Sequence, residues 1–185
     1  MLRLSAKSES FRFPIPGNNH IRFVINYFAP YLLTNGLLAV LKNGDSASII
    51  NLSLAAQSSV SIEALQGKAS ISSQVAYAQI KLALTMWSFA LAKTNPDIIT
   101  IAVNPGSLLN KKMVQEAYGQ FWSSADKGAT ILYDLAISES YEESNGKYFD
   151  NDKGTFSNAH IDTYNQEKID QLIFETEKIL KNEYK

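Results

Sequence analysis

The sequence predicts a single α/β domain over residues 1–185, built on a parallel β-sheet, and three observations lead to this fold class. The chain has 185 residues, which is enough for one domain with a substantial core and few for two. Apolar residues make up 45% of the chain and charged residues 19%, as is typical of a soluble globular protein. Short runs rich in Ile and Val alternate with long helical segments. Such alternation predicts a partial doubly wound parallel sheet with right-handed crossovers.

The first part of the chain is expected to form two long helices and one strand. A helix is predicted over about residues 20–42, where the Asn-Gly of "KNGD" supplies a stop signal. Residues 46–54, "SASIINLSL", are short and rich in Ile, which predicts a buried strand. A polar, Ser-rich loop over 55–73 then leads to a second helix over 73–94, which ends before Pro96.

The second part is expected to add two strands and two helices. Residues 97–106, "DIITIAVNPG", predict a buried strand that ends at the Pro-Gly pair. An irregular segment follows to about residue 124, and a helix is predicted near 125–139. Residues 146–150, "GKYFD", predict a third strand, and 164–181 form an amphipathic helix. The sequence shows no internal repeat and no linker.

Composition and charge exclude several classes of function. The net charge of −1 gives no electrostatic reason to expect nucleic acid or an anionic membrane as a partner. With no Cys and only two His, the chain has neither a disulfide framework nor a Cys/His zinc site. The N-terminal "MLRLSAKSES" lacks the apolar region of a signal peptide. A cytoplasmic protein without a bound metal is therefore expected.

One uncharged stretch, residues 23–41, is nearly long enough to cross a bilayer. Asn26, Pro30 and Gly36 interrupt it with polar or helix-breaking residues. A helix buried between a sheet and a partner has the same apolar composition on most of its sides. The second interpretation is the expected one, without a membrane span.

Two Tyr-x-x-x-Lys pairs raise the question of chemistry. Tyr77 precedes Lys81, and Tyr164 precedes Lys168, at the same separation. A spacing of four residues places both groups on one helix face, where an ammonium favours the phenolate of a tyrosine that otherwise titrates near pH ~10. Tyr and Lys also extend in this way from ordinary packed helices. The first pair follows a predicted strand and so lies near the carboxyl rim of the sheet, where ligands bind, whereas the second belongs to a polar C-terminal helix face.

Five motifs in order give the chain a specific resemblance. They are "VINYFAPYLLT", "SIINLS", "YAQIK", "VNPGSLL" and "NGKYFDND". From about residue 20 to the C-terminus the chain resembles the short-chain dehydrogenase/reductase family, and in particular its retinol-dehydrogenase-like branch. The resemblance implies a Rossmann-like fold that is truncated here to its C-terminal portion. It also implies an NAD(P)-dependent oxidoreductase that acts on a carbonyl or alcohol.

The resemblance assigns roles to particular residues. Tyr77 matches the general acid/base, Lys81 the residue that lowers its pKa, and Asn26 the helix residue of the proton relay. Pro105 and Gly106 match the turn that passes the nicotinamide ring of the cofactor. Each position also has a structural interpretation, because Pro30 near Asn26 is compatible with a packing kink and Pro-Gly with a simple strand stop.

The sequence also departs from the family pattern. The glycine-rich run Gly-x-x-x-Gly-x-Gly, which brings dinucleotide phosphates to a helix N-terminus, does not occur in it. Leu54 stands where the resemblance implies a catalytic serine, and Ser53 beside it is expected to point to the opposite face of the strand. We therefore expect that this chain alone does not bind NAD or NADP. The alternative to an enzyme is a truncated, non-catalytic remnant that serves as a folded oligomeric module.

Self-association is the expected form of assembly. The family strand order 3-2-1-4-5-6-7 implies that a missing first half uncovers the edge of strand 4, and uncovered edges pair with other chains. We expect a homo-oligomer through helices 20–42 and 73–94, with the residues before about 20 covering the edge. The side chains expected at that interface are Tyr27, Tyr31, Leu38, Leu84, Trp87 and Leu91.

Overall fold

The computed structural model of the chain describes residues 18–107 and 125–183. Four strands form one sheet in the order β1-β2-β3-β4, with β1 at Ser48–Leu52, β2 at Ile99–Asn104, β3 at Lys147–Asp150 and β4 at Thr155–Ser157. The first three strands are parallel, with Ser48 opposite Ile99 and Ile101 opposite Lys147. The predicted α/β fold with a parallel sheet is therefore confirmed.

The fourth strand was not predicted. β4 runs antiparallel to β3, with Phe149 opposite Phe156. Its three residues are too few for a recognisable apolar pattern, and the turn before it closes because Gly154 takes a φ of +69° and donates to the Asp150 carbonyl. The sheet is thus mixed at this edge, as is common in α/β proteins.

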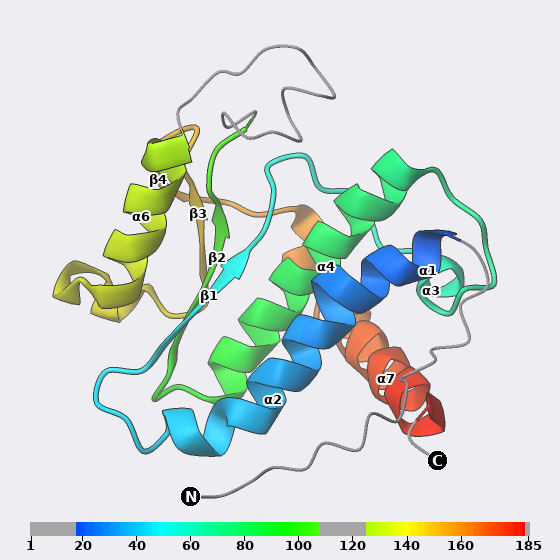
Figure 1. Cartoon of the computed structure of the whole chain (residues 1–185), viewed down its shortest axis with the longest axis horizontal. Helices are drawn as coiled ribbons and strands as arrows, with labels where there is room; N and C mark the ends of the chain where they lie inside the picture. The colour runs from blue at the N-terminus through cyan, green and yellow to red at the C-terminus, as the bar shows by residue number, and fades with distance from the viewer. Residues whose placement is uncertain (1–17, 108–124, 184–185) are drawn as a thin grey trace, which may run out of the picture.

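Helices cover both faces of the sheet (Figure 1). The first helical run consists of α1 (Asn18–Phe23), a π-helical turn η1 (Val24–Phe28) and α2 (Ala29–Leu41). After β1 come the short α3 (Ile62–Leu65), inside the predicted loop, and α4 (Ser73–Thr94). The remaining helices are α6 (Ala125–Ile137) and α7 (Gln166–Glu183), and short 3₁₀ turns η2 (Glu139–Ser144) and η3 (Ile161–Tyr164) precede β3 and α7. α6 lies on one face of the sheet, and the other long helices lie on the opposite face.

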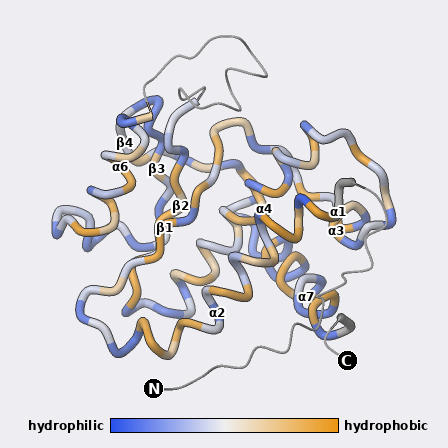
Figure 2. Tube along the Cα trace, in the orientation of Figure 1, coloured by the Kyte–Doolittle hydropathy of each residue, from blue (hydrophilic) through white to orange (hydrophobic). Residues whose placement is uncertain are grey.

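Local signals explain where α4 and α7 form. Ser72 caps α4 by accepting a hydrogen bond from the Val75 N–H, and Pro96 stops the helix two residues beyond its end. In α7, hydrophobic and hydrophilic residues alternate around the helix (Figure 2), so that Ile169 and Leu172 face the core. Both helices therefore form where the sequence predicts them.

The main core lies between the sheet and the helices α1, α2, α4 and α7. Its largest fully buried side chains include Phe23, Tyr27, Phe28, Ile80, Leu82 and Leu172. A second cluster under α6 joins Ile101, Val103, Leu135 and Phe149 on the other face of the sheet. A strand that is buried on both faces has apolar residues at nearly every position. This explains why "IITIAV" (98–103) does not alternate between apolar and polar residues.

One expectation about assembly needs correction. Of the six side chains expected at an oligomer interface, five are 9% exposed or less and Leu38 packs against them, because they form this chain's own core. The free sheet edge is that of β1, which pairs only with β2 among the described strands, and no described strand precedes it. The residues before 18, which were expected to cover the edge, lie outside the described part of the chain.

Within the described residues, two helical segments are long and apolar enough to cross a membrane by length and composition alone. In α4, 72% of the most apolar window is buried, as in the core helix of a globular fold. In Ile21–Leu41 only 17% is buried, so the second segment has an open apolar surface.

A buried hydrogen bond between distant segments yields a first prediction. Tyr27 Oη lies 3.0 Å from Thr176 Oγ1, and the Thr176 hydroxyl already donates to the Leu172 carbonyl at 2.7 Å. Thr176 has one hydroxyl proton, so Tyr27 is the donor. We expect Tyr27→Phe to lower the free energy of unfolding by about 0.5–1.5 kcal/mol, since it removes a buried hydrogen bond and leaves the ring in place. Urea denaturation measures this.

Tyr133→Phe is the matched control for that substitution, because Tyr133 is 65% exposed. It is expected to leave the unfolding free energy unchanged. Equal stability of the Tyr27→Phe protein and the wild-type chain would contradict the assigned bond.

Candidate active site

The candidate site lies where β1 ends and α4 begins. Lys81 as a whole residue is only 7% exposed. Its ammonium donates a 2.6 Å hydrogen bond to the carbonyl of Leu52, the last residue of β1. Its side chain also lies over the Tyr77 ring, with Nζ 5.5 Å from the ring centroid. The sequence spacing thus brings the two groups together on one helix face at the carboxyl rim of the sheet.

The phenol of Tyr77 is held mainly in its protonated form. Burial raises the pKa of Tyr77 above its ordinary value, and the positive charge of Arg22 opposes that rise. Because a raised pKa keeps the proton on the oxygen at neutral pH, the isolated chain presents Tyr77 as an acid rather than a base. Arg22 was not recognised in the sequence, since its approach to Tyr77 depends on how α1 packs against α4.

Asn26 lies on η1, which also packs against α4. Its side-chain amide donates to the Arg22 carbonyl at 3.1 Å, within its own helix. The turn is π-helical, since the Ala29 N–H reaches back five residues to the Val24 carbonyl. Pro30, four residues after Asn26, has no N–H. The Asn26 carbonyl therefore lacks the usual i+4 donor, as the sequence predicts.

Neither of the two residues at the position of the expected catalytic serine presents a free hydroxyl. Ser53 is 4% exposed, and its hydroxyl lies 2.6 Å from Thr85 Oγ1 and 3.3 Å from the Lys81 carbonyl. Gln57 donates to the same hydroxyl at 2.8 Å. The Ser53 hydroxyl is thus directed at α4, and its hydrogen bonds are all made within this chain. Leu54 is half-buried and offers no hydroxyl.

Hydrogen bonds fix the conformation of the Pro105–Gly106 turn at the same rim. Gly106 has a φ of +124°, which a residue with a Cβ adopts only with strain. Its N–H donates to the side-chain oxygen of Asn104, which is fully buried. Asn104 in turn donates to Asp150 at 2.9 Å and to Asp152 at 2.8 Å. The turn therefore has a defined shape before any cofactor binds.

Asp152 also belongs to this hydrogen-bond network. It accepts from the Ser107 backbone at 2.8 Å and from the Ser107 hydroxyl at 2.6 Å. Burial opposes ionisation, but the hydrogen bonds from Ser107 and Asn104 and the charge of Lys127 hold the pKa of Asp152 below its usual value. The carboxylate is therefore ionised at neutral pH and holds Ser107, the residue after Gly106.

A hollow of about 470 Å³ opens at this rim. Tyr148 forms part of its wall and donates from its hydroxyl to the Leu54 carbonyl at 3.1 Å. The size lies within the range of small-molecule sites. The lining residues are Ala55, Gln57, Tyr148, Asp150, Asp152, Lys153, Asn158, Ala159 and His160.

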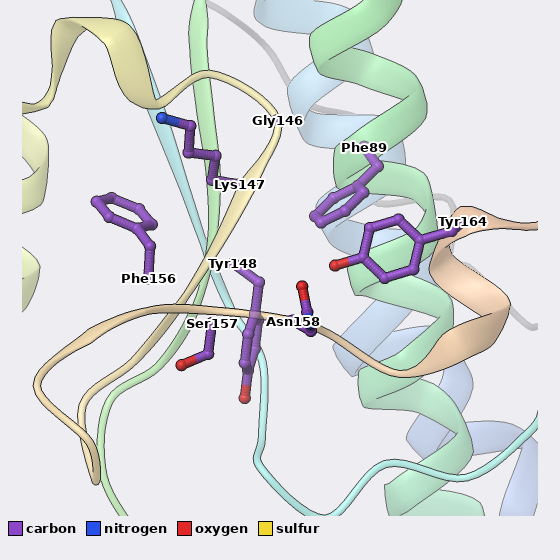
Figure 3. Close-up of a pocket in the computed structure, with 8 residues that line it drawn as sticks. All are labelled: Phe89, Gly146, Lys147, Tyr148, Phe156, Ser157, Asn158 and Tyr164. Atoms are coloured by element: carbon purple, nitrogen blue, oxygen red, sulfur yellow. The ribbon is translucent and has the colours of Figure 1, made fainter.

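A second hollow of about 460 Å³ lies on the far side of Tyr148 and Asn158. Figure 3 shows Phe89 and Tyr164 together on one side of it, with Tyr148 and Asn158 nearer the strands. Neither Tyr77 nor Lys81 lines either of these two hollows. Both hollows therefore lie apart from the Tyr77–Lys81 pair.

The second Tyr-x-x-x-Lys pair is structural. Tyr164 packs its ring edge-on against Phe89 at 5.7 Å, and its hydroxyl accepts from the Ala159 N–H. The Lys168 ammonium donates a hydrogen bond of 2.6 Å to the buried carboxylate of Asp162 rather than to Tyr164. Both side chains are about half exposed, as expected of a solvated face, and their polar ends also hold the C-terminal segment in place.

Known proteins resemble the chain in sequence and in fold. No family model matches the chain. Human polyprenol dehydrogenase is 31% identical in an alignment of 174 residues that covers 81% of this chain and 51% of that protein. Mouse retinol dehydrogenase 12 is 30% identical in an alignment of 139 residues that covers 69% of this chain and 44% of that protein. The structure of a carbonyl reductase from chicken fatty liver with bound NADPH superposes with a TM-score of 0.56 and 20% identity, over 76% of this chain and 57% of that one.

The chain belongs to the short-chain dehydrogenase/reductase family. It spans about half the length of the curated relatives that it matches. The structural likeness shows the Rossmann-like fold, and the sequence relatives are polyprenol and retinol dehydrogenases, as the motifs predict. The carboxyl rim at the ends of β1 and β2 is therefore the candidate active site of this short-chain dehydrogenase/reductase.

The anchor at Asp162 yields a second prediction. Burial opposes its ionisation, but hydrogen bonds from Lys168 and Ser59 and the charges of Lys168 and His160 hold the pKa of Asp162 below its usual value. A depressed folded-state pKa stabilises the fold above the unfolded pKa of about 3.9, and this stabilisation disappears as pH falls through the folded value. Since Lys168 is half exposed and screened, we expect Asp162→Asn to cost about 1–2 kcal/mol at pH 7.

The measurement is urea denaturation at pH 7 and again below pH ~4, where the difference between wild-type and variant should shrink. Asp170→Asn, at an exposed carboxylate on α7, is the control and should be neutral. A stability difference that does not depend on pH would mean that the carboxylate charge is not what Asp162 contributes.

Proposed function

We propose that this chain carries the proton-transfer half of an NAD(P)-dependent oxidoreductase that interconverts an alcohol and a carbonyl compound. One observation carries the proposal: Tyr77 and Lys81 stand on successive turns of α4, with the Lys81 ammonium bonded to the carbonyl end of β1. The family membership and the names of the relatives, which are dehydrogenases and reductases, support the same reaction class.

Tyr77 is the proton donor for the reducing direction. Its raised pKa keeps the phenol protonated, so the hydroxyl can give its proton to a carbonyl oxygen as that oxygen gains negative charge. Lys81 and Arg22 place positive charge beside the resulting phenolate and stabilise it. In the oxidising direction the same oxygen takes the proton back from the alcohol. Asn26, on the adjacent helical turn, contributes a backbone carbonyl to which Pro30 cannot donate.

The described residues fit the nicotinamide end of a dinucleotide cofactor, which supplies or accepts the hydride when bound. Gly106 allows a close approach because it has no Cβ, and Pro105 shapes the turn in front of it. The Lys81 ammonium lies at the same rim, where it donates to the Leu52 carbonyl. For the phosphates the sequence contains no Gly-x-x-x-Gly-x-Gly run. The cofactor would therefore need a second structural half for its phosphate and adenine portions.

A non-catalytic folded module is the second candidate, and Leu54 favours it. Leu54 occupies the position at which the family resemblance implies a carbonyl-polarising serine, and Ser53 is used by α4. Without that hydroxyl the substrate oxygen loses one hydrogen-bond donor in the transition state, worth about 3–4 kcal/mol. Substitution experiments separate the two candidates.

Cofactor binding by the chain alone is the third prediction. We expect no measurable binding of NADH or NADPH, because no loop for the phosphates exists in the sequence. Isothermal calorimetry with each nucleotide is the measurement, with a full-length relative as positive control. Micromolar affinity for either nucleotide would show that this chain holds the cofactor by other means.

Restoring the serine is the fourth prediction. Leu54→Ser in this chain alone should create no dehydrogenase activity, since one hydroxyl cannot position a cofactor that is not held. When the cofactor-binding half of human polyprenol dehydrogenase is co-expressed with the chain, the same substitution should raise turnover by about 10²–10³-fold. Turnover of retinal or a prenal with NADPH is the readout.

The decisive test of the function is Tyr77→Phe in that co-expressed Leu54→Ser protein. Loss of the phenol proton should lower turnover by about 10²–10⁴-fold. Tyr164→Phe, in the second Tyr-x-x-x-Lys pair, is the matched control and should leave turnover unchanged. Undiminished turnover in Tyr77→Phe would refute the proposed role of Tyr77.

A further inference from the structure

The hollow beside Phe89 takes no part in the proposed reaction. Its volume of about 460 Å³ lies within the range of small-molecule sites. Four of the eight residues that line it are aromatic, and they come from β3, β4, η3 and α4 (Figure 3). Phe89 belongs to the last turns of α4, whereas Tyr77 and Lys81 stand near its start. Because a helix rises about 1.5 Å per residue, Phe89 lies about 18 Å along the axis from Tyr77.

One wall of the hollow is a flat aromatic surface that is held in place. The Tyr164 ring packs edge-on against Phe89, with the ring centroids 5.7 Å apart. Its hydroxyl accepts a hydrogen bond from the Ala159 N–H at 3.0 Å, which fixes the outer end of the ring. Tyr164 is nevertheless 54% exposed. A fixed ring with an exposed face is a surface on which another planar ring can pack.

Tyr148 forms the side of the hollow nearer the strands (Figure 3). It is only 5% exposed, and its hydroxyl donates to the Leu54 carbonyl at 3.1 Å. The far end of this ring is thus fixed as well, and its hydroxyl proton is already used. Since two aromatic rings are held independently of each other, the hollow is formed before any ligand binds, as small-molecule sites usually are.

Asn158 supplies the polar group of the hollow. Figure 3 shows its side chain between the rings of Tyr148 and Tyr164. The side-chain amide makes no hydrogen bond with any other described residue. An amide presents an acceptor oxygen and a donor nitrogen side by side, so it pairs through two hydrogen bonds with a ring edge that carries both a donor and an acceptor. An open amide between aromatic rings is therefore suited to a planar heterocycle.

The charge of the lining favours an uncharged ligand. Among the eight described residues that line the hollow none is acidic, so a cationic ligand finds no counter-charge there. The one basic residue, Lys147, directs its side chain away from Phe89 and Tyr164 (Figure 3). Its ammonium lies over the Phe156 ring, 5.7 Å from the centroid. An anionic ligand packed on Tyr164 therefore finds no cation from the lining beside it.

We propose that the hollow between Phe89, Tyr148 and Tyr164 is a binding site for an uncharged planar heterocycle whose edge carries an adjacent N–H donor and carbonyl acceptor, as in a lactam. The ring packs against Tyr164 and Phe89, and Asn158 pairs with the polar edge. The site is independent of the proposed function, since neither Tyr77 nor Lys81 lines it.

A peptide that adds a strand is a less suitable occupant of this hollow. Strand addition depends on main-chain hydrogen bonds along a sheet edge. At this edge β4 is only three residues long, and the chain then turns away toward η3. The rings and the single amide instead match the size and polarity of a small molecule.

Binding of 2-quinolone, a two-ring lactam, to the full 185-residue chain tests the proposal. Isothermal calorimetry measures the affinity, and two-dimensional NMR of the ¹⁵N-labelled chain locates the site. A dissociation constant of about 0.1 mM is expected for a ligand of this size, with the largest amide shifts near Gly146, Asn158 and Tyr164. 1-Methyl-2-quinolone, which keeps the rings but has no N–H, should bind about tenfold more weakly.

Substitutions in the hollow identify the groups that bind. Asn158→Ala should weaken 2-quinolone binding about tenfold, because it removes the paired amide. Asn43→Ala, at an exposed asparagine outside the hollow, is the matched control and should have no effect. Tyr164→Leu should weaken binding through the lost ring, and Tyr164→Phe, which keeps the ring, should bind more tightly than Tyr164→Leu. Asn158 and Tyr164 are both exposed, so these variants are expected to fold, and thermal denaturation checks this.

Equal binding of the two quinolones, unchanged affinity in Asn158→Ala, or the largest shifts at Tyr77 and Lys81 would each overturn the proposal. The absence of saturable binding of 2-quinolone would overturn it too. A chain that binds 2-quinolone at Asn158 but gives no turnover with a co-expressed cofactor-binding half retains this site and counts only against the proposed function.

Discussion

The attachment of α4 to β1 is the constraint on which the rest of the structure depends. Three polar side chains on one face of α4, at positions 81, 85 and 88, meet three successive residues of the strand end. Lys81 donates to the Leu52 carbonyl at 2.6 Å, Thr85 meets the Ser53 hydroxyl at 2.6 Å, and Ser88 accepts from the Asn51 amide at 2.8 Å. All three contacts are buried or nearly so, and in such surroundings an unpaired polar group would cost about 1–3 kcal/mol. The helix is thereby held in one rotation and one axial position.

That single placement has consequences at the rim. With α4 held by its polar face, Tyr77 stands one turn before Lys81 and beside the helix that carries Asn26. The same attachment uses the hydroxyl of Ser53, which therefore cannot serve a substrate. The geometry for proton transfer and the lack of a carbonyl-polarising hydroxyl thus have one structural origin. A catalytic serine would have to come from position 54, where this chain has leucine.

The two ends of the described chain differ in how complete they are. On the β3 side, β4 pairs with β3, and the hydrogen bonds of Asn104, Asp152 and Asp162 tie the neighbouring turns together. On the β1 side, β1 pairs only with β2 among the described strands, and several apolar side chains of the first helical run are exposed.

Sequence alone determined the alternation of helices and strands, the parallel core, and the position of Tyr77 and Lys81 at the rim, because these follow from local periodicity and from motif order. The faces that each helix buries were decided only by tertiary packing. Tyr31 and Trp87 were expected to face a partner, yet their rings lie 5.1 Å apart inside the core. When a helix has apolar residues on both sides, nothing in the local sequence indicates which side packs against its own chain.

The same reason explains β4, Arg22 and Lys168, whose roles depend on neighbours far along the chain. A three-residue strand has too few residues to show a period, and the charge of Arg22 reaches Tyr77 only once α1 has packed on α4. Lys168 finds Asp162 rather than Tyr164, because a buried carboxylate needs a cation more than an exposed phenol does. Local sequence determines which elements form, whereas long-range contacts decide which side chains meet.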